Sequence, residues 1–513
     1  MAPSSLLALA SGALLALSFP RYGHPAVAFV ALVPLLVAVC GWAGRPGACV
    51  GVHPRRAFLF GLMAGAVHFA GTVYWTGATV QTFGGLSWPV AILVAGLLVI
   101  YMATFLAVAM AIAAVFVRRL GAAGILLAPA AWVSTEYLRG HLFGGFPWIP
   151  LGNTMVTLLP IAQLASVTGV YGLSLLVAFV NAGVAVAVIT AGRSRAVASV
   201  ATIALVLAVS VWGGQRLAAN RLVTSGTPVK VALIQGNILQ VDKWNPARAA
   251  MIVDRYLRLT DQAVAGGAEL VVWPESSTPF YFDDDPAGRE IREAVRRWGT
   301  PLLLGSDEIE PGRPNTLYNS AFMLDRGGAT AAVYRKIHLV PFGEYVPFQQ
   351  MLFFVAPLVE AVSSFSPGRF VTMLPVNGHM ASTAVCYEVT YPELMRDAVR
   401  QGSELLTTIT NDAWYGSSSA PFQHFEMATM RAIEQGRYLV RAANTGVSGI
   451  VDPYGRVLAR TQLFETVALV GEARFVQEKT VYAKIGDWVA FGSAGLTLLA
   501  LLAAVAVGRI RPA

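Results

Sequence analysis

A glutamate, a lysine and a cysteine, residue types that together can support nucleophilic chemistry, lie at or just beyond the ends of apolar segments in the second half of the chain. Glu275 closes the segment VVWPE, Lys336 lies in YRKIHL, and Cys386 closes AVC. Strand ends are where open α/β sheets collect their functional groups. Each residue alone is weak evidence, because such a glutamate is usually a turn residue, such a lysine is usually solvated and such a cysteine is usually inert core.

The cysteine count favours a nucleophile at Cys386. The chain has three cysteines, and Cys40 and Cys49 belong to its apolar first half. The topology derived below places Cys386 in an external, oxidising compartment without a disulfide partner. A thiol that stays free there is better explained as a nucleophile than as core. Because no His or Cys cluster of ligand spacing accompanies it, we expect neither a metal site nor a cofactor.

The three residue types permit acyl transfer. A free thiol has a pKa of about 8.5, so a carboxylate, here Glu275, must take its proton before Cys386 can attack a carbonyl carbon. Negative charge then builds on the carbonyl oxygen, and Lys336 suits its stabilisation; loss of one such donor costs roughly 3 kcal/mol in other enzymes. The product of the attack is a thioester, which an amine or water resolves.

The composition divides the chain into two bodies. Of 513 residues, 55% are hydrophobic and 13% are charged, and the mean hydropathy is +0.58. Soluble domains average roughly 25% charged residues, so a purely water-soluble protein is excluded, and so is a disordered one. Residues 1–241 hold 12 Lys and Arg residues and a single acidic residue. Residues 242–513 hold 25 Lys and Arg residues and 28 Asp and Glu residues. The net charge of +8 is therefore the sum of +11 and −3. Because the basic loops of a membrane body account for the positive charge, no nucleic-acid partner is needed to explain it.

Eight segments are apolar and long enough to cross a bilayer as helices. They are 4–20, 25–42, 57–77, 88–117, 122–138, 161–190, 196–214 and 487–508. A cleavable signal peptide is the alternative for residues 1–20. We do not favour it, because these residues lack the charged start and the small-residue cleavage site that such a peptide needs. The predicted domains are a membrane domain of about seven helices at 1–214, a globular domain at 215–486, and a last helix with a short tail at 487–513.

The basic residues of the loops orient these spans. Nine arginines follow the second, fourth, sixth and eighth spans, against two in the alternate loops. Cytoplasmic loops carry the excess of positive charge. Both termini are therefore predicted to be cytoplasmic, and the globular domain is predicted to lie on the far side.

Glu136 is the single acid of the membrane body, and Arg139 follows it by three residues. An ionisable group within a membrane is a functional candidate. A carboxylate and a guanidinium one helical turn apart also form an ordinary interfacial ion pair. Both interpretations remain open.

From about residue 228 the pattern alternates between short apolar runs and amphipathic stretches, which favours an α/β domain. The predicted strands are 229–234, 268–273, 301–305, 319–324, 380–387, 404–410, 446–452 and 456–460, and the predicted helices are 246–264, 286–298, 391–401 and 421–438.

At these residues the sequence resembles the nitrilase superfamily of Glu-Lys-Cys enzymes, and the membrane body narrows the resemblance to the apolipoprotein N-acyltransferase family. The order and spacing of the matching blocks is highly specific. The blocks are EYLRG at 136–140, GFPW at 145–148, QGN at 235–237 with Trp244, WPE at 273–275, KIHLVPFGEYVP at 336–347, CYE at 386–388 and NDAW at 411–414.

The resemblance implies a four-layered αββα domain on about eight spans of a bacterial inner membrane, facing the periplasm. It implies that Cys386 takes the sn-1 acyl chain of a phospholipid, typically phosphatidylethanolamine, and passes it to the α-amino group of the diacylglyceryl-cysteine of an apolipoprotein. Glu275 would be the general base and Lys336 the stabiliser of the transition state. No cofactor is implied, and we expect a monomer.

The resemblance also assigns supporting residues. Glu344 matches an acid that orients the lysine or assists proton transfer, and Tyr387 and Glu388 match residues required beside the nucleophile. Trp244 and Trp414 match aromatic positions on loops near the site, and Trp148 belongs to a matching block of the membrane body; we expect them to contact lipid or gate the site. Packing or ordinary salt-bridge roles are the alternatives for these residues.

Two other functions remain as alternatives. A membrane-tethered amidase would share the three residues but would resolve the thioester with water. A transporter with an external binding domain would need several paired polar groups within the spans, and Glu136 is the one acid there.

Overall fold

The computed structural model describes residues 2–42, 44, 49–341, 343–345 and 365–510. Arg45 and Arg511 of the loop-charge count, and residues 342, 346 and 347 of the KIHLVPFGEYVP block, lie outside the described residues. The chain divides into two compact units. The helical unit comprises Met1–Gln81, Ser87–Ala219 and Ile485–Ala513, and the two-sheet unit comprises Thr82–Leu86 and Asn220–Lys484.

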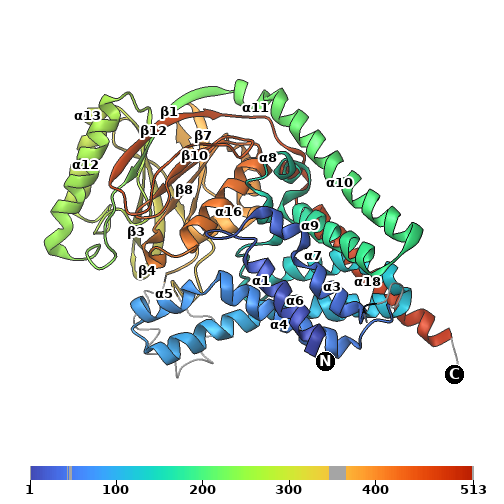
Figure 1. Cartoon of the computed structure of the whole chain (residues 1–513). Coiled ribbons are helices and arrows are strands. Elements are labelled where there is room, and N and C mark those ends of the chain that lie inside the picture. The colour runs from blue at the N-terminus through green and yellow to red at the C-terminus, as the bar shows by residue number, and fades with distance from the viewer. Residues whose placement is uncertain (1, 43, 45–48, 342, 346–364, 511–513) are drawn as a thin grey trace. The chain divides into compact units, whose positions relative to one another are not determined.

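The helical unit consists mainly of apolar helices (Figure 1). Its main helices are α1 (Ala2–Ala16), α2 (Ala28–Ala31), α3 (Val33–Cys40), α4 (Pro54–Thr72), α5 (Trp75–Gly84), α6 (Trp88–Leu120), α7 (Ala128–Arg139), α8 (Leu159–Ala162), α9 (Ala165–Ile189), α10 (Gly192–Ala219) and α18 (Trp488–Ile510). Cys40 and Cys49 form a disulfide, which leaves Cys386 as the free member of the three cysteines.

Within the described residues, fewer helices have the length and hydropathy of a membrane span than the sequence predicted. Three stretches qualify, Trp88–Arg139, Ala165–Ile189 and Gly192–Thr224, and a fourth does if α4 and α5, which meet at a 57° bend, count as one. Three shorter apolar helices, Pro3–Ala16, Pro25–Cys40 and Trp488–Ala504, account for the other predicted segments. The number eight therefore stays a prediction.

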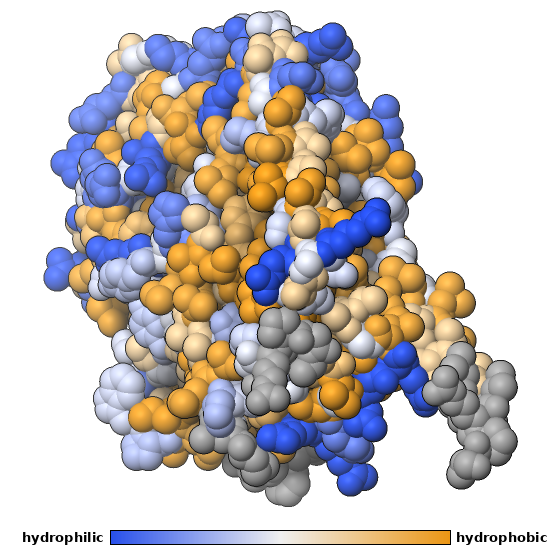
Figure 2. Space-filling view, turned by 45° about the vertical axis from the view of Figure 1, so that its right-hand side comes forward, coloured by the Kyte–Doolittle hydropathy of each residue, from blue (hydrophilic) through white to orange (hydrophobic). Residues whose placement is uncertain are grey.

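The surface of the helical unit is apolar where a soluble protein would be charged. Only 6% of the apolar window of Gly192–Thr224 is buried, and side chains such as Val200 and Leu207 of α10 are more than half exposed. Figure 2 shows hydrophobic residues spread over much of the surface in view. Exposed apolar area on this scale marks contact with lipid or another apolar partner.

The two-sheet unit has four layers, with helices on the outer faces of a pair of six-stranded sheets (Figure 1). The first sheet has the order β12-β1-β2-β3-β4-β5, and the second has the order β11-β10-β9-β8-β7-β6. The strands are β1 (Thr227–Gln235), β2 (Leu270–Val272), β3 (Leu302–Glu310), β4 (Arg313–Leu324), β5 (Thr330–Arg335), β6 (Leu374–Val376), β7 (His379–Val385), β8 (Leu405–Thr410), β9 (Leu439–Ala443), β10 (Gly449–Val451), β11 (Val457–Arg460) and β12 (Val467–Phe475). The covering helices are α12 (Ala249–Ala265), α13 (Pro286–Trp298), α15 (Pro392–Gln401) and α16 (Ala420–Gln435).

The strand directions bring the three candidate residues to carboxyl ends. In the first sheet β2 pairs parallel with β3, which pairs antiparallel with β4, which pairs antiparallel with β5, so β2 and β5 run the same way. Glu275 follows β2, Lys336 follows β5 and Cys386 follows β7. Functional groups of open sheets collect at such ends.

The buried face of the first sheet packs on α12 and α13. Ile252 and Tyr256 of α12 and Ile291 of α13 join a core with strand residues, and the Tyr256 ring stacks on Trp273 at 4.9 Å between centroids. The Trp273 indole donates a hydrogen bond to Thr260 Oγ1 at 2.9 Å, which satisfies its buried N–H. This core fixes the segment that ends in the candidate glutamate.

Some sequence expectations were wrong in detail. The helix expected at 421–438 ends at Gln435, because Gly436 adopts φ +63° and β9 begins three residues later. The strand expected at 380–387 ends at Val385, and the cysteine after it opens a 3₁₀ turn, Cys386–Thr390. Strands β5, β6, β9 and β12 were missed, because they are short or contain Ala, Gly or charged residues that weaken a strand pattern.

Helix α13 offers a test of the fold. Asp285 Oδ1 accepts a hydrogen bond from Ala287 N at 2.8 Å and so caps the helix, whose first residue is Pro286. Replacing such a cap by alanine costs about 1 kcal/mol. We expect Asp285→Ala to lower the thermal stability of the two-sheet unit by about this amount. Asp284→Ala is the matched control; an equal loss in both variants would refute the capping role.

Candidate active site

Lys336 lies between two carboxylates. Its Nζ donates hydrogen bonds to Glu344 Oε1 at 2.8 Å and to Glu275 Oε1 at 3.4 Å, and all three side chains are buried. Asn319 Nδ2 donates to the same two oxygens at 2.9 and 2.7 Å, and Val340 N donates to Glu344 Oε2 at 2.8 Å. Burial lowers the pKa of Lys336, but the two carboxylates outweigh it and raise the pKa above its ordinary value. The amine therefore stays an ammonium.

Glu275 is held as a carboxylate. Besides Lys336 and Asn319, the backbone N–H of Asn411 binds it, donating to Oε2 at 2.8 Å. Burial raises the pKa of Glu275, but the Lys336 and Lys243 ammonium groups and the hydrogen bonds from Asn319 and Asn411 lower it below its ordinary value. The group is thus ionised at neutral pH and can take up a proton.

Glu388 ties the lysine segment to the cysteine segment. Its Oε1 accepts hydrogen bonds from Tyr334 Oη, Ile337 N and His338 N at 2.9, 2.6 and 3.0 Å, and its Oε2 accepts one from Val385 N at 2.7 Å. Burial raises the pKa of Glu388 to about 7, while these backbone donors lower it. Four donors on one carboxylate lock two segments 50 residues apart into one arrangement.

Cys386 occupies a strained backbone position. Its φ is +55°, a region that costs a non-glycine residue about 1–3 kcal/mol. The free thiol is buried, and burial and the Glu275 carboxylate raise the pKa of Cys386 while Lys336 lowers it. The resting group is therefore a thiol that must lose its proton to react. Tyr387 beside it is also buried, and its hydroxyl accepts a hydrogen bond from Tyr391 Oη at 3.4 Å.

The three tryptophans that the sequence singled out differ in exposure. Trp244 and Trp414 are 44% and 37% exposed, and Trp414 meets Phe83 edge-on at 4.7 Å between ring centroids. Trp148 belongs to the helical unit, where it is fully buried against Trp75. Exposure suits the first two for contact with a ligand, and the roles of all three stay predictions.

Two polar residues in contact with Glu275 were not predicted from the sequence. Asn319 bridges the two carboxylates described above. Lys243 is buried, and its Nζ donates to the backbone carbonyl of Glu275 at 3.0 Å. Burial lowers the pKa of Lys243, and the Glu275 and Asp307 carboxylates raise it. The effect of burial is the larger, so the pKa is lowered to about 8. Its place directly before Trp244 was a usable signal, whereas nothing local distinguishes Asn319.

Comparisons with known proteins identify the family of the chain. Residues 230–474 match the carbon-nitrogen hydrolase family, and residues 11–183 match the apolipoprotein N-acyltransferase N-terminal domain. An apolipoprotein N-acyltransferase of Geobacter metallireducens is 42% identical over 97% of this chain and 95% of its own length. The corresponding protein of Shewanella oneidensis is 33% identical over 94% of this chain and 92% of its own. The chain belongs to the apolipoprotein N-acyltransferase family.

Two solved structures are each similar to about half of this chain. Saccharomyces cerevisiae Nit3, a member of branch 10 of the nitrilase superfamily, is 19% identical and covers 49% of this chain and 93% of its own, with a TM-score of 0.39. An amidase of Nesterenkonia sp. is 23% identical and covers 51% of this chain and 94% of its own, with a TM-score of 0.37.

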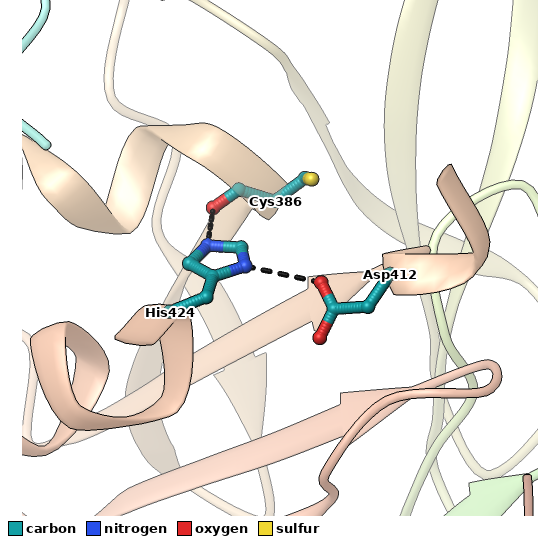
Figure 3. A group of neighbouring side chains, drawn as sticks. All are labelled: Cys386, Asp412 and His424. Atoms are coloured by element: carbon teal, nitrogen blue, oxygen red, sulfur yellow. Dashed lines mark hydrogen bonds and ion pairs between the residues drawn. The ribbon is translucent and has the colours of Figure 1, made fainter. Parts of the chain in front are cut away.

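Among the described residues, one group of side chains has potential metal ligands close together. The ligand atoms of Cys386, Asp412 and His424 all lie within 4.8 Å of one another (Figure 3). Both ring nitrogens of His424 already face protein oxygens, and Arg441 Nη2 lies 2.9 Å from Asp412 Oδ2. A guanidinium at that position repels a cation, so this set of residues does not fit a metal ion.

Strand β3 passes so close to the candidate base that only glycine fits. A Cβ on Gly305 would lie 2.6 Å from both Glu275 Cα and the Pro274 carbonyl oxygen. We expect Gly305→Ala to displace this segment and to destabilise the unit by about 1–3 kcal/mol, as overpacking does. Thermal unfolding tests this. Gly327→Ala is the control, because its methyl would meet only the Asp325 side chain, at 3.3 Å.

The raised pKa of the thiol predicts a pH dependence. A protonated thiol releases more thiolate as pH rises, so alkylation of Cys386 by iodoacetamide should still be accelerating at pH 9.5, above the ordinary thiol pKa of about 8.5. Glu275→Gln removes a charge that raises this pKa, so its alkylation rate should level off at a lower pH than that of the unmodified protein. Peptide mass spectrometry measures both rates. A plateau below pH 8.5 in the unmodified protein would contradict the raised pKa.

Proposed function

We propose that this protein transfers an acyl chain from a membrane phospholipid to the N-terminal α-amino group of lipid-modified proteins. The names of near full-length relatives support N-acylation of apolipoproteins. The observation that carries the chemistry is a buried, free Cys386 in the same unit as a buried ammonium, Lys336, that is hydrogen-bonded to the carboxylate of Glu275. This is the set of groups that a thioester mechanism needs.

In the first half-reaction, Glu275 takes the thiol proton as Cys386 Sγ attacks the sn-1 ester carbonyl of the phospholipid. The carbonyl oxygen becomes negatively charged, and the Lys336 ammonium stabilises it. The intermediate then breaks its C–O bond, and Glu275 returns the proton to the departing alkoxide. The products are a lysophospholipid and an acyl-thioester on Cys386, and we propose phosphatidylethanolamine as the donor.

In the second half-reaction, the α-amino group of a diacylglyceryl-cysteine attacks the thioester carbonyl. Glu275 removes a proton from the amine, the C–S bond breaks, and the thiolate of Cys386 recovers the proton. An amide replaces a thioester, so the step is downhill without a nucleotide or a metal. The ester bond of the donor supplies the activation.

The supporting residues act through this centre. Glu344 orients Lys336, because it accepts the shorter of the two hydrogen bonds from its ammonium. Glu388 holds the backbone before the nucleophile through Val385 N, and Tyr387 is buried directly after it. The exposed rings of Trp244 and Trp414 contact the lipid substrates.

The setting is the second part of the proposal. Eight spans place residues 215–486 on the periplasmic side of the inner membrane with both termini in the cytoplasm, and the protein works as a monomer. Both substrates are anchored in the same bilayer, so each encounter is two-dimensional. The apolar exposed faces of helices such as α10 support membrane insertion.

Intact-protein mass spectrometry tests the first half-reaction. The purified full-length protein, incubated in detergent with phosphatidylethanolamine, should gain the mass of one acyl chain, and hydroxylamine should remove it. Cys386→Ala should gain nothing. The double variant Cys40→Ala/Cys49→Ala is the control that leaves Cys386 as the one thiol, and it should still be acylated.

Addition of a synthetic diacylated lipopeptide tests the second half-reaction. The acyl chain should leave the protein and appear on the peptide's α-amine. Loss of the adduct at the same rate without peptide would favour a hydrolase. Absence of any adduct in the unmodified protein would refute the thioester mechanism.

A further inference from the structure

A buried histidine contacts the backbone of the nucleophile. His424 lies on α16 and is completely buried, and its Nε2 lies 3.0 Å from the backbone carbonyl oxygen of Cys386 (Figure 3). A carbonyl oxygen can only accept a hydrogen bond, so Nε2 carries a proton and donates it. In Figure 3 the sulfur points away from the imidazole, so the ring reaches the nucleophile through its backbone and not through its thiol.

Two further residues hold this ring in place. His424 Nδ1 lies 3.0 Å from Asp412 Oδ1, and Arg441 Nη2 lies 3.0 Å from the same nitrogen and 2.9 Å from Asp412 Oδ2. Thr410 Oγ1 donates to Asp412 Oδ1 at 2.9 Å. These residues come from β8, the turn after it, α16 and β9, so four segments converge on one ring. Asp412, Arg441 and His424 are all fully or almost fully buried.

We propose that His424, held by Asp412 and Arg441, is a positioning residue that fixes the Cys386–Tyr387 peptide and so keeps the nucleophile in its strained conformation. This inference rests on the proposed function, because it matters only if Cys386 is acylated.

The peptide between Cys386 and Tyr387 is a planar unit. Because the peptide unit is planar, a hydrogen bond that fixes the carbonyl of Cys386 also fixes the orientation of the N–H of Tyr387. Cys386 has φ +55°, which an L-residue adopts only when its surroundings hold it there. Glu388 binds the N–H of Val385 on one side, and His424 binds the carbonyl on the other. Without the second contact, the backbone can relax and carry the thiol out of line with its base.

Two amide replacements of different length distinguish the hydrogen bond to the Cys386 carbonyl from the contacts that the ring makes with Asp412 and Arg441. In His424→Gln the side-chain N–H can reach the place of Nε2 and donate to the Cys386 carbonyl. In His424→Asn the amide reaches only the place of Nδ1, so contact with Asp412 and Arg441 remains and the bond to Cys386 is lost. Both replacements are polar and neutral, so a difference between them reports the hydrogen bond.

The readout is the rate of acyl-enzyme formation on the full-length protein in detergent, followed by intact mass, against phosphatidylethanolamine concentration. We expect His424→Asn to lower the maximal rate about 100-fold with half-saturation unchanged, and His424→Gln to stay within about tenfold of the unmodified protein. Thermal unfolding checks that both variants are folded. A merely structural role would lower stability without this split between the two amides.

Three results would overturn the proposal. The first is a folded His424→Asn that acylates within about threefold of the unmodified rate. The second is a folded His424→Gln as slow as His424→Asn. The third applies if His424→Asn does not fold: a folded His424→Gln that is 100-fold slow would then show that the donor does not sustain the reaction.

A failure of the proposed function can be distinguished from a failure of the positioning role of His424. If the unmodified protein forms no acyl adduct, the thioester mechanism is wrong, and the rates of iodoacetamide alkylation at Cys386 then test the positioning alone. Alkylation should differ between His424→Asn and the unmodified protein and be close to normal in His424→Gln. Equal rates in all three proteins would refute the positioning role.

Discussion

A buried ammonium group shared by two carboxylates is the interaction on which the two-sheet unit depends. Lys336 would be costly to bury alone, and so would Glu275 or Glu344. Together with the amide of Asn319 they satisfy one another. The arrangement is possible only because β2 and β5 of the first sheet end on the same side.

The second sheet supplies the candidate nucleophile and the contacts that restrain it. Cys386 follows β7 with a left-handed backbone, and its pKa is raised by burial and by Glu275. Glu388 joins the lysine segment to the cysteine segment, because its two carboxylate oxygens accept hydrogen bonds from the backbone N–H groups of Ile337 and Val385. Cys386 is contacted from within its own turn by Glu388, which binds Val385 N, and from α16 by His424, which binds its carbonyl oxygen.

Much of this could be predicted from the sequence, because short motifs carried it. Apolar runs that end in Glu275 and Cys386 indicated an α/β unit, and the family assignment that the motifs suggested is confirmed by near full-length relatives. The residues that hold the site from a distance could not be predicted. Asn319, His424 and Arg441 lie within a strand or helix pattern, and only the packing of two sheets brings them to the centre. Strand β9 was missed for a related reason, because its buried Arg441 reads as a surface residue until its partner Asp412 is known.

The helical unit could be predicted in composition but not in the number of its spans. Hydropathy identifies apolar segments, whereas a break such as the 57° bend between α4 and α5 depends on packing. The apolar stretch Trp88–Arg139 likewise combines two predicted spans.

The decisive measurement is a high-resolution structure of the full-length protein after incubation with phosphatidylethanolamine. We expect an acyl chain joined to Cys386 Sγ, with its carbonyl oxygen within hydrogen-bonding distance of Lys336 Nζ and with Glu275 and Glu344 still bound to that lysine. An acyl chain on another residue, or a thioester whose oxygen points away from Lys336, would contradict this expectation.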